Sequence, residues 1–188
     1  MPATCENHFS DRLLLRQWKD SDRQKFHAIN NDADVMRYFP RTFTYEESDA
    51  FINKSISNIA KFGWGSWAVE LIDSGEFIGF VGFSEPADWH PCAGNLEIGW
   101  RLGRKYWGHG YATEAAICAM QFGFNTLGFE DVVSFTSACN LPSINVMKKL
   151  GMKEDNVGFI HPRIDLASHL AKHVVFRISK SEWQTKFG

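Results

Sequence analysis

The chain has 188 residues, which suits one domain with a sizeable hydrophobic core. Its 22% charged and 14% aromatic residues exclude a disordered chain. The net charge of −2, without blocks of like charge, argues against a nucleic-acid-binding protein, and no apolar run reaches the length of about 18 residues that spans a membrane.

The N-terminus is polar and lacks the apolar core of a signal peptide. The cysteines show no CxxC pair and no disulfide-like spacing: Cys5, Cys92, Cys118 and Cys139. Free thiols in a reducing compartment fit this pattern, so we expect a cytoplasmic protein. Cys118 lies on the apolar face of a predicted helix, which favours a packing role. The pair His169 and His173 runs into a strand-like segment, so we expect no metal site.

The first predicted strand is Arg12–Trp18, and a helix with acidic residues at its start follows over residues 20–30. Residues 35–40 are predicted to be a loop or a short helical piece that ends at proline. Thr44 and Glu47 have the spacing of a capping box, which opens a helix that runs to about Phe62. Its buried face is predicted from isoleucines that repeat every three or four residues: Ile52, Ile56 and Ile59.

A β-hairpin is predicted from the segments 66–72 and 77–84 on either side of Asp73-Ser74-Gly75-Glu76. Gly79 and Gly82 in its second strand indicate a bulge or close packing. The remaining predicted elements are a strand at 95–102, a helix at 111–126, a strand at 131–138, a helix at 142–150, strands at 152–160 and 173–179, and a turn at 182–187. This order predicts an α/β fold, a mixed sheet with helices on its faces.

The segment Leu102–Glu114 (LGRKYWGHGYATE) joins a predicted strand to a predicted helix, and the rest of the chain is organised around it. The first N–H groups of a helix have no internal partner, and the helix dipole places partial positive charge there. Gly108 and Gly110 let a ligand approach the backbone closely. We therefore expect a phosphate or pyrophosphate here, with Arg104 and Lys105 adding charge.

A plain strand–helix turn with two exposed cations is the alternative, because short glycine motifs often occur by chance. Two known phosphate motifs are excluded. The chain has no Gly-Lys-Ser/Thr, so this is not a Walker A loop, and the third glycine of a dinucleotide-binding fingerprint would fall on Thr113.

A second group of polar residues follows the strand at 131–138: Asn140, Ser143, Asn145 and Lys149. Strand ends in open sheets are where ligands bind. A helix cap at Asn140 and a cation near a helix C-terminus at Lys149 are the structural alternatives. Two such strand–helix junctions in one small domain favour a binding site.

These motifs resemble the GNAT superfamily of acyl-CoA-dependent N-acyltransferases. Residues 105–112 (KYWGHGYA) stand where that family has its (Arg/Gln)-x-x-Gly-x-(Gly/Ala) pyrophosphate loop, and Asn140-x-x-Ser143 followed by Lys149-Leu-Gly151 matches its second signature. The opening RLLLR, the strand LEIGW and the loop YWGHGYATEA are similar to the branch of ribosomal-protein alanine N-acetyltransferases. The resemblance covers residues 10–184. It implies a single domain with a mixed, mostly antiparallel sheet splayed into a V and helices on both faces.

The resemblance also implies that acetyl-CoA is the co-substrate and that no metal takes part. Backbone N–H groups of residues 107–112 would hold the pyrophosphate, and the backbone of residues 98–100 would pair with the pantetheine arm. The implied cofactor-binding residues are Ile98, Gly99, Trp100, Lys105, Tyr106, Trp107, Gly108, His109, Gly110, Tyr111, Ala112, Thr113, Asn140, Ser143, Asn145 and Lys149. Lys105 replaces the usual Arg or Gln, a mild departure because backbone donors dominate.

The implied reaction is direct acetyl transfer from the thioester to an amine. An alkyl ammonium has a pKa of about 10 and must lose a proton before it attacks, and Glu97 is the candidate catalytic base. A strand glutamate that faces solvent or pairs with an arginine is the alternative. Many family members protonate the leaving thiolate with a tyrosine, but Met147 stands in that position, so Ser143 is the candidate donor. No covalent enzyme intermediate is required, so Cys139 needs no role.

Acceptor selection is expected from the early helices, residues 35–43 and residues 159–168, with candidate lining residues Phe39, Trp64, Trp89 and His161. A protein N-terminus and a small-molecule amine both stay open, as do a monomer and a homodimer. Two other functions also stay open. A non-catalytic acyl-CoA sensor would not need Glu97 or Ser143, and a nucleotide-binding module would be stabilised by ATP or NAD instead of acetyl-CoA.

Overall fold

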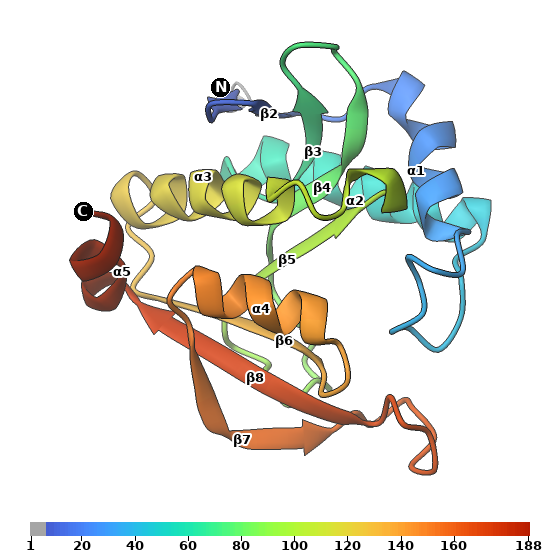
Figure 1. The fold of residues 1–188 in the computed structure, drawn as a ribbon, viewed down its shortest axis with the longest axis vertical. Coiled ribbons are helices and arrows are strands. Elements are labelled where there is room, and N and C mark those ends of the chain that lie inside the picture. The colour runs from blue at the N-terminus through green and yellow to red at the C-terminus, as the bar shows by residue number, and fades with distance from the viewer. Residues whose placement is uncertain (1–6) are drawn as a thin grey trace. The chain divides into compact units, whose positions relative to one another are not determined.

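The computed structural model describes residues 7–188, except for the side chain of Val157 (Figure 1). The chain forms two compact units. The first comprises the residues up to Phe83 together with Gly99–Met120, and the second comprises Ser84–Ile98 and Gln121–Gly188. Strand β5 (Glu97–Leu102) and helix α3 (Tyr111–Asn125) each pass from one unit into the other.

The first unit has strands β1 (His8–Phe9), β2 (Leu13–Arg16), β3 (Ser66–Leu71) and β4 (Phe77–Ser84), paired antiparallel in that order. The end of β5 lies beside β4, since the Gly103 N–H donates to the Ile78 carbonyl. The short helix η1 (Asp20–Asp22) leads into α1 (Arg23–Asn30), and α2 (Tyr45–Phe62) follows. Apolar side chains of these elements form the core, among them Trp18, Phe26, Ile52, Ala68 and Phe80.

The predicted capping box is confirmed at the start of α2. The Thr44 hydroxyl accepts from the Glu47 N–H, and the Glu47 carboxylate accepts from the Thr44 N–H. Ile52 and Ile59 are fully buried, and Ile56 is partly buried against the same core. The repeat of isoleucines therefore marks the inner face of the helix, as predicted.

The two glycines of β4 allow close packing of neighbouring backbone. A Cβ added to Gly79 would lie 2.1 Å from the Arg101 carbonyl oxygen, and one added to Gly82 would lie 2.0 Å from that of Gly65. The close-packing prediction is therefore confirmed. The register shift of the hairpin also lies beside Gly79, since Val69 pairs with Gly79 and Glu70 with Phe77, which leaves Ile78 as the extra residue of β4.

In the second unit the start of β5 pairs in parallel with β6 (Asp131–Ser137), and β8 (Lys172–Ser179) pairs antiparallel with both β6 and β7 (Lys153–Ile160). Helices α4 (Leu141–Lys149) and α5 (Lys180–Phe187) complete it. The strand pairings β1–β2, β2–β3, β3–β4, β6–β8 and β7–β8 are all antiparallel, whereas β5 and β6 are parallel. The sheet is thus mixed and mostly antiparallel, as predicted, and its splay into a V stays a prediction.

The structure differs from the predicted elements at three places. Strand β1 and the short helix η2 (Arg104–Tyr106) were not predicted, and α5 is a full helix where only a turn was expected. A capping box explains α5, because the Ser179 hydroxyl accepts from the Glu182 N–H and the Glu182 carboxylate reaches back. Residues 35–40 form turns, which is the loop alternative of the prediction.

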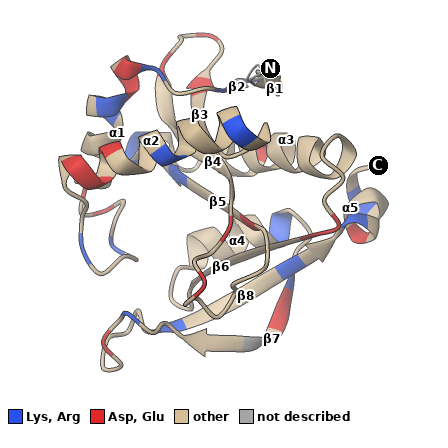
Figure 2. Ribbon diagram, turned by 180° about the vertical axis from the view of Figure 1, so that it is seen from behind, with Lys and Arg blue, Asp and Glu red and all other residues tan. Residues whose placement is uncertain are grey.

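Three cysteines, Cys92, Cys118 and Cys139, are free thiols, and Cys5 lies outside the described residues. Cys118 is buried in α3, and burial raises the pKa of its thiol to about 11. Within residues 7–188, no cluster of His, Cys, Asp and Glu could hold a metal ion, and no helix is both long and apolar enough to cross a bilayer. Acidic and basic residues are interspersed along the ribbon (Figure 2).

Candidate active site

The segment between β5 and α3 forms the predicted glycine turn. Gly108 has a φ of 81° and Gly110 a φ of 82°, both in the left-handed region that favours glycine. The Glu114 N–H donates to the Gly110 carbonyl, which begins the hydrogen-bond ladder of α3. The N–H groups before Glu114 therefore point ahead of the helix, where the helix dipole favours an anion.

An ion pair within the first unit fixes this turn to the segment between β1 and β2. Arg12 donates from Nε and Nη2 to the Glu114 carboxylate, at 2.7 and 2.5 Å. The same Nη2 donates to the His109 carbonyl at 3.1 Å, and the guanidinium lies 4.6 Å above the Tyr111 ring. The Ser10 hydroxyl and the Arg12 N–H also donate to Glu114. The carboxylate at the start of α3 thus holds both the helix and the turn before it.

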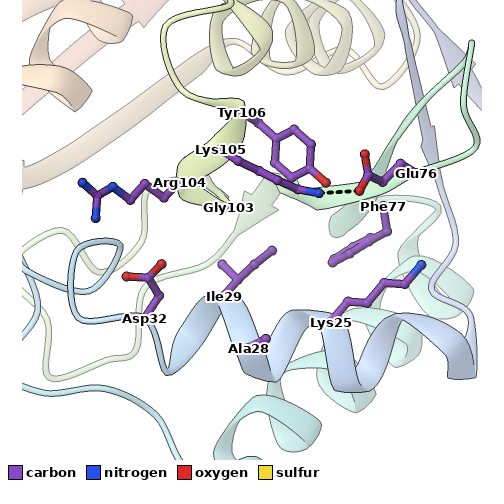
Figure 3. A pocket seen from close by; sticks show the side chains of 10 residues that line it. All are labelled: Lys25, Ala28, Ile29, Asp32, Glu76, Phe77, Gly103, Arg104, Lys105 and Tyr106. Atoms are coloured by element: carbon purple, nitrogen blue, oxygen red, sulfur yellow. Dashed lines mark hydrogen bonds and ion pairs between the residues drawn. The ribbon is translucent and has the colours of Figure 1, made fainter.

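The two cations before the turn are paired with carboxylates. Lys105 Nζ lies 2.5 Å from Glu76 Oε1, and this hydrogen bond raises the pKa of Lys105. Arg104 pairs with Asp34. Figure 3 shows Lys105 and Glu76 facing each other over an open pocket of about 710 Å³ between α1, the start of β4 and η2. A contact of Lys105 with a bound anion stays a prediction.

Strand β5 carries the candidate base. Ile98 is fully buried, while Gly99 and Trp100 are partly exposed. Glu97 is half-buried, and the Ser84 hydroxyl donates to its Oε2 at 3.1 Å. Burial raises the pKa of Glu97 to about 7, although the bond from Ser84 opposes the rise. The carboxyl group can therefore exchange a proton near neutral pH, as a general base must.

The second signature is built around Asn140 at the start of α4. Its Oδ1 accepts from the Ser143 N–H at 3.3 Å, and its Nδ2 donates to Thr136 Oγ1 at 2.9 Å and to Ser143 Oγ at 3.1 Å. The helix-cap interpretation of Asn140 is thereby confirmed. Because Ser143 Oγ accepts from the amide, its own proton is left to donate elsewhere.

The remaining residues of this segment differ in burial. Met147 is 1% exposed and belongs to the core, so no group in the usual tyrosine position can protonate a thiolate. Asn145 and Lys149 are exposed, as the prediction of a surface contact requires. Ser137 Oγ lies 3.2 Å from the Cys139 sulfur, a contact that gives the thiol no catalytic partner.

Two of the candidate acceptor-lining residues, Phe39 and Trp64, belong to the first unit, and Trp89 and His161 belong to the second. Trp89 and His161 are neighbours, with ring centroids 5.9 Å apart. Phe39 is 39% exposed and lies against Phe43, and Trp64 stacks on the Phe62 ring.

Comparison with known proteins identifies the family. Residues 12–153 match the model of the acetyltransferase (GNAT) domain. A Bacillus subtilis protein named uncharacterized N-acetyltransferase YnaD is 31% identical over 173 residues, which cover 92% of this chain and 96% of that protein. The chain belongs to the GNAT acetyltransferase family. It is a GNAT-type N-acetyltransferase, and enzymes of this family take the acetyl group from acetyl-CoA.

Solved structures show the same GNAT fold. The acetyltransferase (GNAT family) of Bacillus anthracis is 29% identical, with a TM-score of 0.76 over 94% of this chain and 99% of that one. The spermidine N-acetyltransferase of Vibrio cholerae, in complex with CoA and spermine, has a TM-score of 0.73 at 18% identity, over 93% of this chain and 99% of that one. At this identity the second likeness concerns the fold alone.

Several side chains that bond to residues of the GNAT motifs were not predicted from the sequence. The Arg12–Glu114 ion pair, Glu76 and Ser84 belong to segments far from the residues they contact. Thr136 is close in sequence to its partner, since it lies four residues before Asn140. The motif RLLLR contained Arg12 but gave no sign that its partner stands at the start of a helix about a hundred residues later.

Proposed function

We propose that this GNAT domain, extending over residues 10–184, transfers an acetyl group from acetyl-CoA directly to a primary amine, with Glu97 as general base. The carrying observation is the half-buried Glu97 carboxyl group, whose pKa is raised to about 7. Such a group is a base strong enough to take a proton from an ammonium and yet is largely free of its own proton just above neutral pH.

The proposed reaction balances without a covalent enzyme intermediate. The acceptor ammonium gives one proton to Glu97, and the free amine attacks the thioester carbonyl carbon. A C–N bond forms, the C–S bond breaks, and the sulfur leaves with the bonding electron pair. Ser143 then protonates the thiolate and regains a proton from solvent, since its oxygen is held by Asn140 Nδ2 and its hydrogen is available. Glu97 releases the proton it took to solvent, which restores the enzyme. The second amine proton passes to solvent.

Residues of the glycine turn and of α4 are proposed to bind acetyl-CoA. The left-handed Gly108 and Gly110 and the unpaired first turn of α3 suit a pyrophosphate. The proposed cofactor-binding residues are Ile98, Gly99, Trp100, Lys105, Tyr106, Trp107, Gly108, His109, Gly110, Tyr111, Ala112, Thr113, Asn140, Ser143, Asn145 and Lys149. Backbone donors would dominate, because Lys105 is already paired with Glu76.

Two acceptor classes fit this proposal. The motifs RLLLR, LEIGW and YWGHGYATEA favour the ribosomal-protein alanine N-acetyltransferase branch, which acts on protein N-termini. The same fold also occurs in a Vibrio cholerae enzyme that is named for spermidine, a small amine. Both acceptors are primary amines, which is the class proposed here.

The test measures free thiol released from acetyl-CoA in the presence of a panel of amines. Wild-type protein is expected to release CoA with at least one amine, and Glu97→Gln is expected to lower kcat by about 100-fold or more with an unchanged affinity for acetyl-CoA. Ser84→Ala is the matched variant. It removes a donor that favours the charged carboxylate, so the pKa of Glu97 rises and the pH–rate profile moves to higher pH.

Unchanged turnover in Glu97→Gln would remove Glu97 from the mechanism. Binding of acetyl-CoA without thiol release across a broad panel would contradict the enzymatic proposal and favour the sensor.

A further inference from the structure

A buried arginine in the first unit has no part in the proposed chemistry. Arg101 lies on β5, the strand that also carries Glu97, and is only 9% exposed. Its Nη1 donates to Asn30 Oδ1 on α1 at 2.6 Å. Asn30 Nδ2 in turn donates to the Ser48 hydroxyl on α2 at 3.0 Å. This chain of bonds fixes the guanidinium in one orientation.

The positive charge of Arg101 has no carboxylate partner among residues 7–188. The ion pairs of the described chain do not include it, whereas the other buried arginine, Arg16, lies between Asp22 and Glu70. Arg101 Nε is buried and has no hydrogen-bond partner. Burial lowers the pKa of Arg101 to about 10. A buried arginine is ordinarily paired, since an isolated buried charge is costly.

Aromatic rings surround the guanidinium instead. Its Cζ lies 4.4 Å from the centroid of Phe39, 5.0 Å from that of Phe43 and 5.8 Å from that of Phe80. Rings of this kind attract a cation through their faces and leave its N–H edges free to donate. Phe80 is buried in the core, but Phe39 is 39% exposed and lies in the turns at residues 35–40. One of the three rings around Arg101, that of Phe39, is therefore itself in contact with solvent.

We propose that Arg101 binds a carboxylate of the acceptor, so that the acetylated amine belongs to a molecule that also carries a carboxylate, such as an amino acid. The inference rests on the proposed function. It follows from three observations: a buried cation without an acid, an Nε edge without an acceptor, and a position under the segment expected to select the acceptor. The Nε–Nη2 edge of a guanidinium matches the two oxygens of a carboxylate. A ligand reaches this edge only when the side chains around Arg101 move, and the proposal assigns this movement to the segment of the partly exposed Phe39.

The experiment compares amines with their carboxylate-bearing counterparts: ethylamine with alanine, phenethylamine with phenylalanine, and 1,5-diaminopentane with lysine. Wild-type protein is expected to acetylate the carboxylate-bearing member of a pair with a kcat/KM about 10- to 100-fold higher, the range of one hydrogen-bonded charge. Arg101→Gln and Arg101→Lys are expected to reduce this preference toward unity through a higher KM for the amino acid. The KM for acetyl-CoA stays unchanged.

Arg23→Gln is the matched control, because it removes an arginine of the same unit that is paired with Asp49 and Asp20 on the surface. It is expected to keep the preference. A purely structural role of Arg101 predicts the opposite pattern: Arg101→Gln changes the unfolding midpoint while the preference stays as in the wild type.

A measurement without turnover separates this inference from the proposed function. The buried Nε–H of Arg101 gives an NMR signal, assigned by its loss in Arg101→Lys. N-acetylalanine, which carries the carboxylate, is expected to shift this signal, whereas N-ethylacetamide, which lacks it, is not. If none of the amines causes thiol release from acetyl-CoA, the proposed function is overturned. The NMR result would still decide whether Arg101 binds a carboxylate. Equal kcat/KM within the pairs, or no shift with N-acetylalanine, would overturn the inference.

Discussion

Replacing Glu97 by glutamine is expected to stabilise the folded protein above neutral pH while it impairs catalysis. The carboxyl group is half-buried, and it accepts a hydrogen bond from Ser84. Burial disfavours the charged form and raises the pKa of Glu97 from its usual 4.5 to about 7. Glutamine has the same shape, can accept the same bond through its amide oxygen and carries no charge, so the cost of burying a carboxylate disappears.

The sign and the size of the effect follow from linkage. Below pH 4.5 the carboxyl group is protonated in the folded and in the unfolded chain. As the pH rises, the unfolded chain loses this proton first, and the folded chain keeps it until about pH 7, so wild-type stability falls across that window. The full difference corresponds to about 3 kcal/mol, and solvent around a partly exposed group reduces it to about 1–2 kcal/mol.

The assay is urea unfolding followed by tryptophan fluorescence at several pH values between about 5 and 8.5. Wild type and Glu97→Gln are expected to have similar free energies of unfolding at the acid end, and the variant is expected to be more stable at the alkaline end. Glu182→Gln is a control of opposite sign. Lys153 and the Ser179 backbone lower the pKa of Glu182 to about 2, so its contribution to stability is present throughout this pH range and is lost only below about pH 4.5. Glu182→Gln is therefore expected to be less stable than wild type by the same amount at every pH of the assay.

Two results would refute this reasoning. One is a stability difference between wild type and Glu97→Gln that does not depend on pH. The other is a Glu97→Gln variant that is less stable than wild type at pH 8, which would mean that the carboxylate is favourably bound in the folded protein and that its pKa is not raised.

Two further predictions concern the acetyl-CoA motifs. Gly108→Ala and Gly128→Ala both place an alanine at a positive φ in open space, and each is expected to cost about 1–2 kcal/mol of folding free energy. Only Gly108→Ala should raise the KM for acetyl-CoA, and equal KM values in the two variants would contradict the role of the turn. Asn140→Ala removes a helix cap and is expected to cost about 1 kcal/mol or more by urea unfolding. Asn140→Asp keeps the cap but attracts the Ser143 proton, so it should lower kcat with little loss of stability, and an unchanged kcat would argue against Ser143 as the donor.

Local sequence patterns predicted most of the helices and strands because their causes are local. The capping box at Thr44, the isoleucine repeat of α2 and the cap at Asn140 each depend on residues three or four positions apart. The elements that were missed have weak patterns. Strand β1 has two residues and is held by pairing with β2, and η2 is one short turn of helix.

The candidate site likewise has parts that local motifs predicted and parts that depend on folding. The glycine turn and the Asn140 segment could be found by reading along the chain, since each is a short motif with a fixed spacing. Glu97 could be named as a candidate, but its pKa could not, because burial and the contact with Ser84 are products of folding. The ion pair of Arg12 with Glu114 and the aromatic surroundings of Arg101 join residues far apart in the sequence.

The sequence by itself determined the family, the order of the elements and the backbone turn at the start of α3, because spacing, turn chemistry and helix capping act over a few residues. Only the tertiary structure decided which charged side chains are paired with a side chain of opposite charge and which are not. Lys105, predicted to serve an anion, is paired with Glu76, whereas Arg101, which carried no signal in the sequence, is buried without an acid among the described residues. Electrostatic cost depends on what folding brings within a few ångströms of a charge, and no local pattern records it.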